Sequence, residues 1–332
     1  MSEFVRHTPV DGALDFHQIS QRYRDRQEQV GGNEHSNVVE FSFMAHPLLN
    51  WMGDHHIGHP TTDYKRIEDE VNAIDRTLNS FLIFMGDEID NLHWNPGQFE
   101  QMEQTPEQIL FFWSIVQYMA QRHKLLLRIP GDHDGWLKKS GFDLQAMVRN
   151  EGVNTTNGPT HIVANVGDER YTGFAAHQLP GHSMYNRNHP QARSHRFGAA
   201  GPVDWIISNH NHQKSIQQSF AHTELGQVKP VTYIANGAYK PTDGWLQKKG
   251  YTPQIRTPEQ MYGVSIMLDG KEHNIFVSGD IVEANDAFAD IQQGTAGVNR
   301  LTPLKTGYND EDMTKKWPDW DNFADEAPSE NE

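Results

Sequence analysis

Three short apolar segments lie in the first half of the chain, and each runs into a Gly-Asp pair. Two segments whose apolar residues recur at helical spacing separate them. Apolar strands that alternate with helices are typical of a mainly parallel sheet covered by helices. Ligands of such sheets lie at the carboxyl ends of the strands, so we expect the chemistry there. The predicted strands are 47–52, 80–85 and 124–129, and the predicted helices are 63–78 and 106–121.

The rest of the chain predicts further strands and two flanking regions. A strand is expected at 38–44, and the second half contains six more apolar segments with few long helical patterns. We interpret these segments as a second, more mixed sheet stacked on the first. Residues 37–280 would form the folded domain, 1–36 a polar extension and 281–332 an acidic, partly disordered tail. The six segments are 161–166, 171–176, 203–208, 230–235, 262–268 and 274–278.

Composition narrows the chemistry that the domain can perform. The 332 residues include no cysteine, which excludes disulfides, thiolate zinc sites and cysteine nucleophiles. Any transition metal must be bound by His, Asp, Glu or Asn, and 19 histidines are present. No apolar run reaches the roughly 18 residues of a membrane span, and no signal-peptide pattern is visible, so we expect a soluble, cytoplasmic protein without a membrane partner. A net charge of -16 argues mildly against a broad nucleic-acid-binding surface.

Five short polar motifs follow apolar segments. Each alone is explained by an ordinary turn, because Gly-Asp after a strand is common. Together they favour a metal centre, because buried carboxylates need partners and histidine pairs at strand ends offer no packing advantage. Oxygen and imidazole ligands suit Mn, Fe, Zn or Ni, and their number fits two ions better than one. The motifs are Gly53-Asp54-His55-His56, Gly86-Asp87-Glu88-Ile89-Asp90-Asn91, Gly131-Asp132-His133-Asp134, His177, and Asn209-His210-Asn211-His212.

The order and spacing of these motifs resemble the calcineurin-like metallophosphoesterase superfamily. Its pattern runs D-x-H, G-D-x-x-D, G-N-H-D/E, H and G-H-x-H, and the likeness covers roughly residues 47–240. The resemblance implies a four-layer α/β/β/α sandwich, in which two mixed sheets are flanked by helices. It also implies hydrolysis of a phosphate ester by a hydroxide that two divalent ions activate, with Mn expected first and Fe, Zn or Ni as alternatives. We prefer a phosphodiester, in a nucleotide or in DNA, because the first two motifs resemble diesterase and nuclease branches more than protein phosphatases.

Carried over position by position, the resemblance gives each motif residue a role. Asp87 would bridge the two metals. His133 would lie over the substrate phosphate and protonate the leaving oxygen, and Asp134 or Asp54 would orient it. The first metal would be held by Asp54, His56 and His212, and the second by Asp132, His177 and His210, while Asp90 and Asn91 would support the ligands.

Two positions depart from the family pattern. Asp132 replaces the usual Asn, which adds a negative charge and would favour a harder or more highly charged metal. Asn209 replaces the usual Gly, and we expect Asn to tolerate left-handed backbone geometry there. Arg193 and Arg196, in the polar segment before the last motif, are candidates for binding the substrate phosphate, although a solvated loop explains them at least as well.

Three other interpretations stay open. Asp54-His55-His56 also spells the signature of the DHH phosphoesterases, which do not require the later motifs. A phosphomonoesterase or nucleotide phosphatase would use the same two metals. The alternative from another class is a noncatalytic, metal-stabilised scaffold, in which Asp132 marks lost activity and the acidic tail recruits a protein partner. The presence of His133, which binds no metal in the family pattern, speaks against the scaffold.

Overall fold

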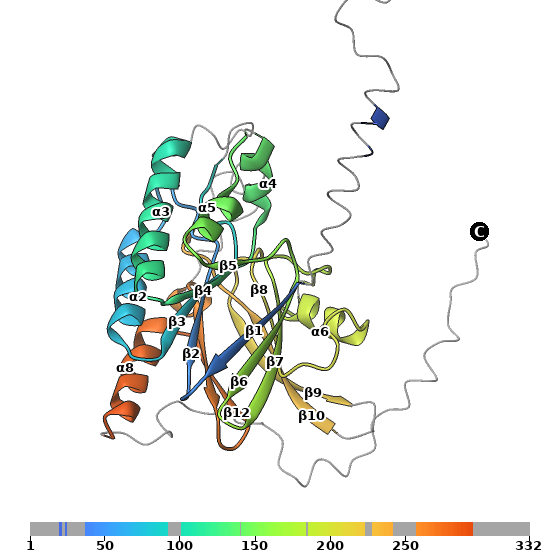
Figure 1. Cartoon of the computed structure of the whole chain (residues 1–332). Coiled ribbons are helices and arrows are strands. Elements are labelled where there is room, and N and C mark those ends of the chain that lie inside the picture. Colours follow the sequence, from blue (N-terminus) through green and yellow to red (C-terminus); the bar gives the residue numbers. More distant parts are fainter. Residues whose placement is uncertain are drawn as a thin grey trace, which may run out of the picture.

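Two six-stranded mixed sheets, stacked face to face and flanked by helices, form the fold (Figure 1). The computed structural model describes residues 20, 21, 24, 37–91, 101–139, 141–183, 185–222, 228–241 and 257–294. Most of the predicted N-terminal extension, and the acidic tail from residue 295 onward, therefore lie outside the described residues. Among the described helices, none combines the length and the apolar character needed to span a membrane.

The first sheet contains the three strands that end in Gly-Asp. In spatial order it consists of β12 (Asn274–Ser278), β11 (Val264–Asp269), β2 (Leu48–Met52), β3 (Ser80–Phe84), β4 (Leu125–Arg128) and β5 (Asn154–Thr155). The strands β2 to β5 run parallel, and β11 and β12 continue the sheet in antiparallel pairing. Every residue of β2 is buried, as expected for a central strand covered on both faces.

The second sheet mixes parallel and antiparallel pairs, as predicted, but two of the six segments expected in it, 262–268 and 274–278, instead form β11 and β12 of the first sheet. In spatial order it consists of β1 (Val38–Phe43), β6 (Thr160–Val166), β7 (Glu169–Ala176), β8 (Trp205–Ser208), β10 (Val228–Ala235) and β9 (Ser215–His222). Because β7, β8 and β10 run parallel, their carboxyl ends lie at one edge of the sheet. No strand was predicted at β9, because this edge strand contains many polar residues and gives little strand signal.

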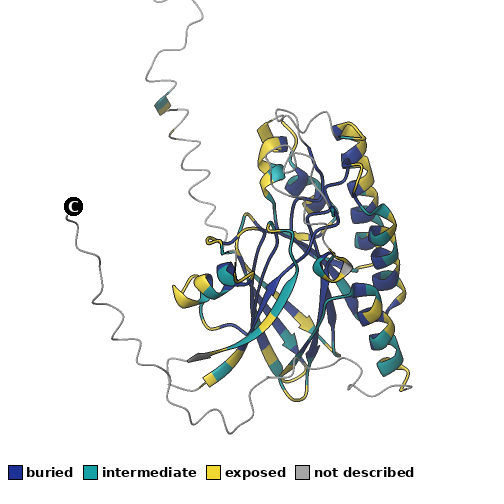
Figure 2. Ribbon diagram, turned by 180° about the vertical axis from the view of Figure 1, so that it is seen from behind, coloured by how far each residue is buried: buried dark blue, intermediate teal, exposed yellow. Residues whose placement is uncertain are grey.

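Apolar side chains fill the space between the two sheets. Trp51 of β2 and Trp205 of β8 are fully buried there, and Figure 2 shows the strands as largely buried. Gly173 in β7 leaves room for the indole, because a Cβ at that position would lie 2.2 Å from the Trp205 ring. Close packing of this kind fixes how the sheets stack and therefore how their strand ends face each other.

Helices cover the outer faces and complete the four predicted layers (Figure 1). The helices α2, α3 and α8 lie along the first sheet, and α6 lies on the second. Asp63 caps α2, since its carboxylate accepts a hydrogen bond from the backbone N of Arg66. The bounds are α2 (Tyr64–Arg76), α3 (Thr105–Gln121), α4 (Asp132–Lys139), α5 (Leu144–Asn150), α6 (His189–Arg196) and α8 (Ile281–Gln292), with a 3₁₀ turn at Pro258–Gln260.

Four helices, α4, α5, α6 and α8, lie where none was predicted. The polar segment between the last two motifs contains α6, and the segment expected to begin the acidic tail begins instead with α8. Ile281, Ala284 and Phe288 of α8 are buried at helical spacing, and the last two pack against the first sheet. Residues 281–292 are thus part of the fold, because this apolar face has a sheet to cover.

Candidate metal centre

The five motifs meet where strands of the two sheets end. Asp54 follows β2 after one glycine, and its backbone N donates to Gly86 O at 2.9 Å. Gly86 in turn lies so close to the next turn that a Cβ on it would be 2.4 Å from the Gly131 backbone N. The second sheet joins the first at this edge, because the backbone N of His210 donates to Asp54 Oδ2 at 2.8 Å.

Backbone strain is concentrated at the same edge. Ten non-glycine residues of the described chain have positive φ, and six of them belong to the motifs, in a region that such residues rarely adopt. Strain of this kind is typical of functional sites. The six are Asp54, His56, Asp87, Asn91, His210 and His212.

Asn209 differs from our expectation, because the left-handed residues of the last motif are His210 and His212. The amide side chain of Asn209 packs instead against Gly53, where a Cβ would lie 2.4 Å from Nδ2. Asn209 is therefore accommodated by the small size of Gly53 and not by a left-handed turn of its own.

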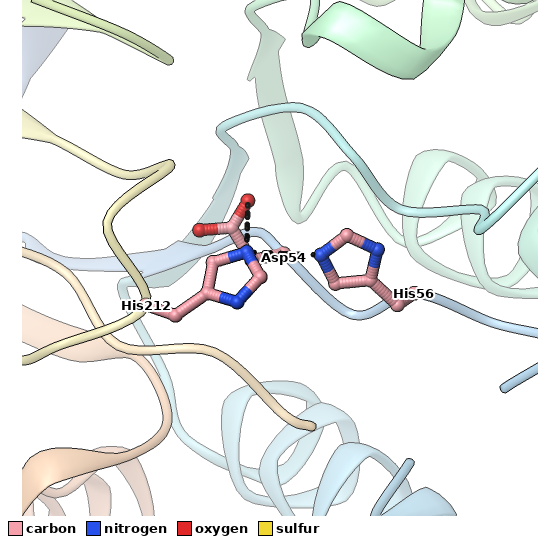
Figure 3. Close-up of side chains that lie close together, drawn as sticks. All are labelled: Asp54, His56 and His212. Atoms are coloured by element: carbon pink, nitrogen blue, oxygen red, sulfur yellow. Dashed lines mark hydrogen bonds and ion pairs between the residues drawn. The ribbon is translucent and has the colours of Figure 1, made fainter. Parts of the chain in front are cut away.

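Asp54, His56 and His212 form the first ligand group (Figure 3). The Nε2 atoms of the two histidines are 3.0 Å apart, and His212 Nε2 is 3.8 Å from Asp54 Oδ1. Asp90 accepts a hydrogen bond from His56 Nδ1 at 2.9 Å, which leaves the Nε2 lone pair of His56 facing His212. A carboxylate behind a ligand histidine fixes the ring in this way at many metal sites. All three predicted ligands of the first metal are thus brought together.

Asp87, His177 and His210 form the second ligand group. His177 Nδ1 donates to Met85 O at 2.8 Å, and its Nε2 is 3.1 Å from Asp87 Oδ2. Asp132, the remaining predicted ligand, lies beside this group, with Oδ2 3.2 Å from His210 Nδ1. The structure therefore places all four residues predicted for the second metal and the bridge at one location.

One buried atom and the spacing of the ligand atoms show that the ligand groups fit metal ions. Asp54 Oδ1 is buried and makes no hydrogen bond, although such an atom is costly to leave unpaired. Ligands about 2.1 Å from a common ion lie roughly 3.0–3.4 Å apart, which matches the 3.0–3.2 Å separations in the two groups. The gap between the groups is small, because Asp54 Oδ1 is 3.8 Å from His177 Nδ1.

The buried ligands have shifted pKa values, and one of these shifts opposes metal binding. Burial raises the pKa of Asp54 to about 7 and lowers the pKa of His56 to about 4. Burial opposes the charge on His177, yet the carboxylate of Asp87 outweighs it and raises the pKa of His177 to about 10. Because an imidazole binds metal only without that proton, metal binding must displace a proton from His177.

His133 lies at the edge of both ligand groups. Its backbone N donates to Asp87 Oδ1 at 2.9 Å, and its Nδ1 donates to the Asp90 carbonyl at 2.5 Å. The second ring nitrogen, Nε2, is 3.8 Å from Asp87 Oδ2. Asn91 supports this arrangement, because its side-chain amide donates to His133 O at 3.4 Å. The His133 ring is thus held through Nδ1, and its Nε2 faces the carboxylate of Asp87.

Asp134 lies elsewhere than beside His133. Its carboxylate accepts two hydrogen bonds from Arg128 Nη2, at 2.7 and 2.9 Å, and one from the Gly131 backbone N at 2.6 Å. Arg128 is fully buried and also donates to Glu88. Asp134 therefore ties the turn between β4 and α4 to the first sheet, and the Asp90 carbonyl is the group that orients His133.

The segment after β10 brings Tyr239 and Lys240, for which no contact with the metal ligands was predicted, to the site. Lys240 is buried, with Nζ 3.6 Å from Asp90 Oδ1. The backbone N of Tyr239 donates to Asp54 O at 3.1 Å, and its ring stacks on His55. Lys is rarely buried without a partner, but the sequence does not show that Lys240 is buried, so no local signal pointed to this contact.

Arg193 and Arg196 are exposed on α6. The Arg193 guanidinium lies over the ring of Phe197, 5.0 Å from its centroid. Their role in substrate binding stays a prediction.

Comparison with known proteins gives structural matches only. No family model and no curated protein matches the chain. Solved structures similar to it include calcineurin-like phosphoesterase YfkN from Bacillus subtilis, at 12% identity and a TM-score of 0.36 over 78% of this chain and 98% of that one. A putative 5'-nucleotidase from Staphylococcus aureus in complex with alpha-ketoglutarate matches at 12% identity and 0.39, over 70% and 53%. A Vps29 double mutant from Entamoeba histolytica matches at 10% and 0.36, over 69% and 89%.

These identities and TM-scores are low, so the matches do not indicate a function. The structure combines two mixed sheets flanked by helices with five motifs that meet at two ligand groups. This is the arrangement expected from the resemblance of the motifs to the calcineurin-like metallophosphoesterase superfamily.

Proposed function

We propose that the protein is a two-metal phosphoesterase that hydrolyses a phosphodiester in a nucleotide or a nucleic acid. The observation that carries the proposal is the buried Asp54 Oδ1, which makes no hydrogen bond and lies 3.8 Å from His212 Nε2 in one ligand group and 3.8 Å from His177 Nδ1 in the other. Asp54, His56 and His212 would hold one ion, and Asp132, His177 and His210 the other, with Asp87 between them. Manganese is the expected metal, since the ligands are carboxylates and imidazoles without thiolates.

Two such ions would supply an activated water and positive charge for the phosphoryl oxygens. The chain itself contributes a proton donor, since His133 is held through Nδ1 by the Asp90 carbonyl and has Nε2 directed at the site. In its protonated form it gives the Nε2 proton to the leaving oxygen, which typically contributes 10²- to 10⁴-fold. Asp90 thus serves two histidines, since its carboxylate also holds His56.

The preference for a diester rests on the resemblance of the first two motifs to diesterase branches. A monoesterase would differ in the rim of the site and not in its ligands, so substrates must separate the two. The test is to strip the protein with chelator, restore Mn, Zn, Ni, Fe or Mg singly, and measure hydrolysis of bis-p-nitrophenyl phosphate and p-nitrophenyl phosphate. Faster hydrolysis of the diester supports the proposal, and faster hydrolysis of the monoester would make the protein a phosphatase.

Matched variants identify the site responsible for turnover. Asp87→Asn removes the carboxylate between the two ligand groups, so it should abolish metal-restored turnover. Asp286→Asn makes the same change in an exposed ion pair with Arg76, with 60% of the Asp286 side chain exposed, and should leave turnover intact. If the wild-type protein binds metal yet hydrolyses no ester, short DNA or nucleotide, the scaffold alternative would replace this proposal.

A further inference from the structure

Trp136 lies at the surface directly beside His133. The two residues are three positions apart on α4 and therefore share a face of that helix. Their rings stack, with centroids 4.3 Å apart and planes at 28°. Trp136 is 39% exposed, whereas Trp51 and Trp205 are fully buried in the core. A large aromatic side chain thus adjoins the proton donor without being needed to fill the interior.

The metal centre is most accessible on the side where α4 begins. The side chains of Asp132 and His210 are 47% and 36% exposed, whereas that of Asp54 is fully buried. Among the described residues the helix surface at Gly135 is open, because a Cβ there would meet no atom within 4 Å beyond its chain neighbours and its own helix backbone. Lys139, three positions further along the helix, is exposed and basic. A substrate that approaches from this side would contact the ring of Trp136 and then the ammonium group of Lys139.

We infer that Trp136 is a stacking platform for the nucleobase on the leaving side of the substrate. The inference rests on the proposed function, in which the leaving oxygen lies at His133. The group attached to that oxygen must extend past His133, and Trp136 is stacked directly on that histidine. Nucleobases stack well on indoles because every base has a π face. Lys139 then suits the next phosphate of a nucleotide chain.

A matched pair of substrates isolates the contribution of the base. One is thymidylyl-thymidine, and the other is the same dinucleotide with an abasic residue on the leaving side. Stacking of one base on an aromatic side chain contributes about 1–3 kcal/mol, which is roughly 5- to 150-fold. The full chain with Mn²⁺ should therefore hydrolyse the base-bearing dinucleotide with a kcat/KM higher by that factor.

Three variants show whether the indole is the cause. Trp136→Ala should bring the ratio of the kcat/KM values for the base-bearing and the abasic dinucleotide to about one. Trp136→Phe should keep part of the preference, since it retains a smaller ring. Phe111→Ala, at a position 38% exposed on α3, is the control and should keep all of it. An equal loss on both substrates in Trp136→Ala would overturn the inference, because the indole would then act on His133. A preserved preference would also overturn it.

Failure of the proposed function has a different signature. In that case the wild-type protein would hydrolyse neither dinucleotide, nor bis-p-nitrophenyl phosphate. The platform is then tested by calorimetry with thymidine 5'-monophosphate and ribose 5-phosphate. Tighter binding of the nucleotide that is lost in Trp136→Ala supports the platform, and equal affinities contradict it.

Discussion

Arg128 in β4 is a fully buried cation, and Arg128→Met should destabilise the protein strongly. The guanidinium donates to Glu88 at 2.5 and 3.2 Å, to Asp134 at 2.7 and 2.9 Å, and to Gln145 at 2.8 Å. Methionine fills a similar volume but leaves the Glu88 carboxylate, which is 0% exposed, without its cation. Removing one partner of a buried ion pair costs about 3–5 kcal/mol.

The loss should depend on pH. Burial raises the pKa of Glu88 to about 7, although Arg128 opposes the shift. Since the folded pKa lies above the unfolded one, the stability contributed by Glu88 is full below the unfolded pKa and is lost as pH rises through the folded pKa. Without Arg128 the ionised form costs still more, so the deficit of the variant should be larger at pH 8 than at pH 5.5.

Urea unfolding of the chelated protein measures this deficit without a contribution from bound metal. A loss of about 3–5 kcal/mol corresponds to a fall in Tm of roughly 6–20 °C for a domain of this size. Arg76→Met breaks an exposed pair with Asp286 and should change stability by no more than about 0.5 kcal/mol. A loss under about 1 kcal/mol in Arg128→Met, or a deficit independent of pH, would refute the reasoning.

Three further predictions concern the metal centre. Lys240→Met should lower the affinity for one of two ions by about 10- to 100-fold in calorimetry, whereas Lys229→Met, in another Lys-Asp pair, should not. Metal-free protein should lose stability in urea as pH rises through 7, because burial raises the pKa of Asp54 to about 7 and its contribution is full only below its unfolded pKa. Burial raises the pKa of Glu88 to about 7 as well, so Asp54→Asn should reduce this slope without abolishing it, and an unchanged slope would contradict the prediction. Gly131→Ala should weaken binding of both ions, because its Cβ would lie 2.1 Å from Asp87 Oδ1; unchanged affinity would count against the bridging role.

The sequence predicted the strands that carry the ligands because each is a short apolar run ending at a glycine. β2, β3 and β4 begin and end within a few residues of the expected limits, and the buried faces of α2 follow its helical spacing. The ligand groups followed from the same pattern, since carboxyl ends of parallel strands converge. Local periodicity was therefore sufficient to predict the strands that carry the ligands and the helix that covers them.

What the sequence did not predict depends on contacts between distant segments. Lys240 lies beside Asp90 only because β10 ends next to the first sheet, and no local pattern encodes that approach. Asp134 appeared to be a partner of His133 by its position in the motif, yet the buried Arg128 binds it. For α8 a local signal existed, since its buried residues recur at helical spacing, but the acidic segment that follows obscured it.

The two-metal claim is tested most directly by turnover measured against metal equivalents. Chelator-stripped protein is titrated with Mn²⁺ at a protein concentration well above the dissociation constants, and hydrolysis of bis-p-nitrophenyl phosphate is followed at each step. We expect the rate to rise until two equivalents are bound and then to level off. A rate that levels off at one equivalent, or no turnover after two ions are bound, would contradict a two-metal phosphoesterase.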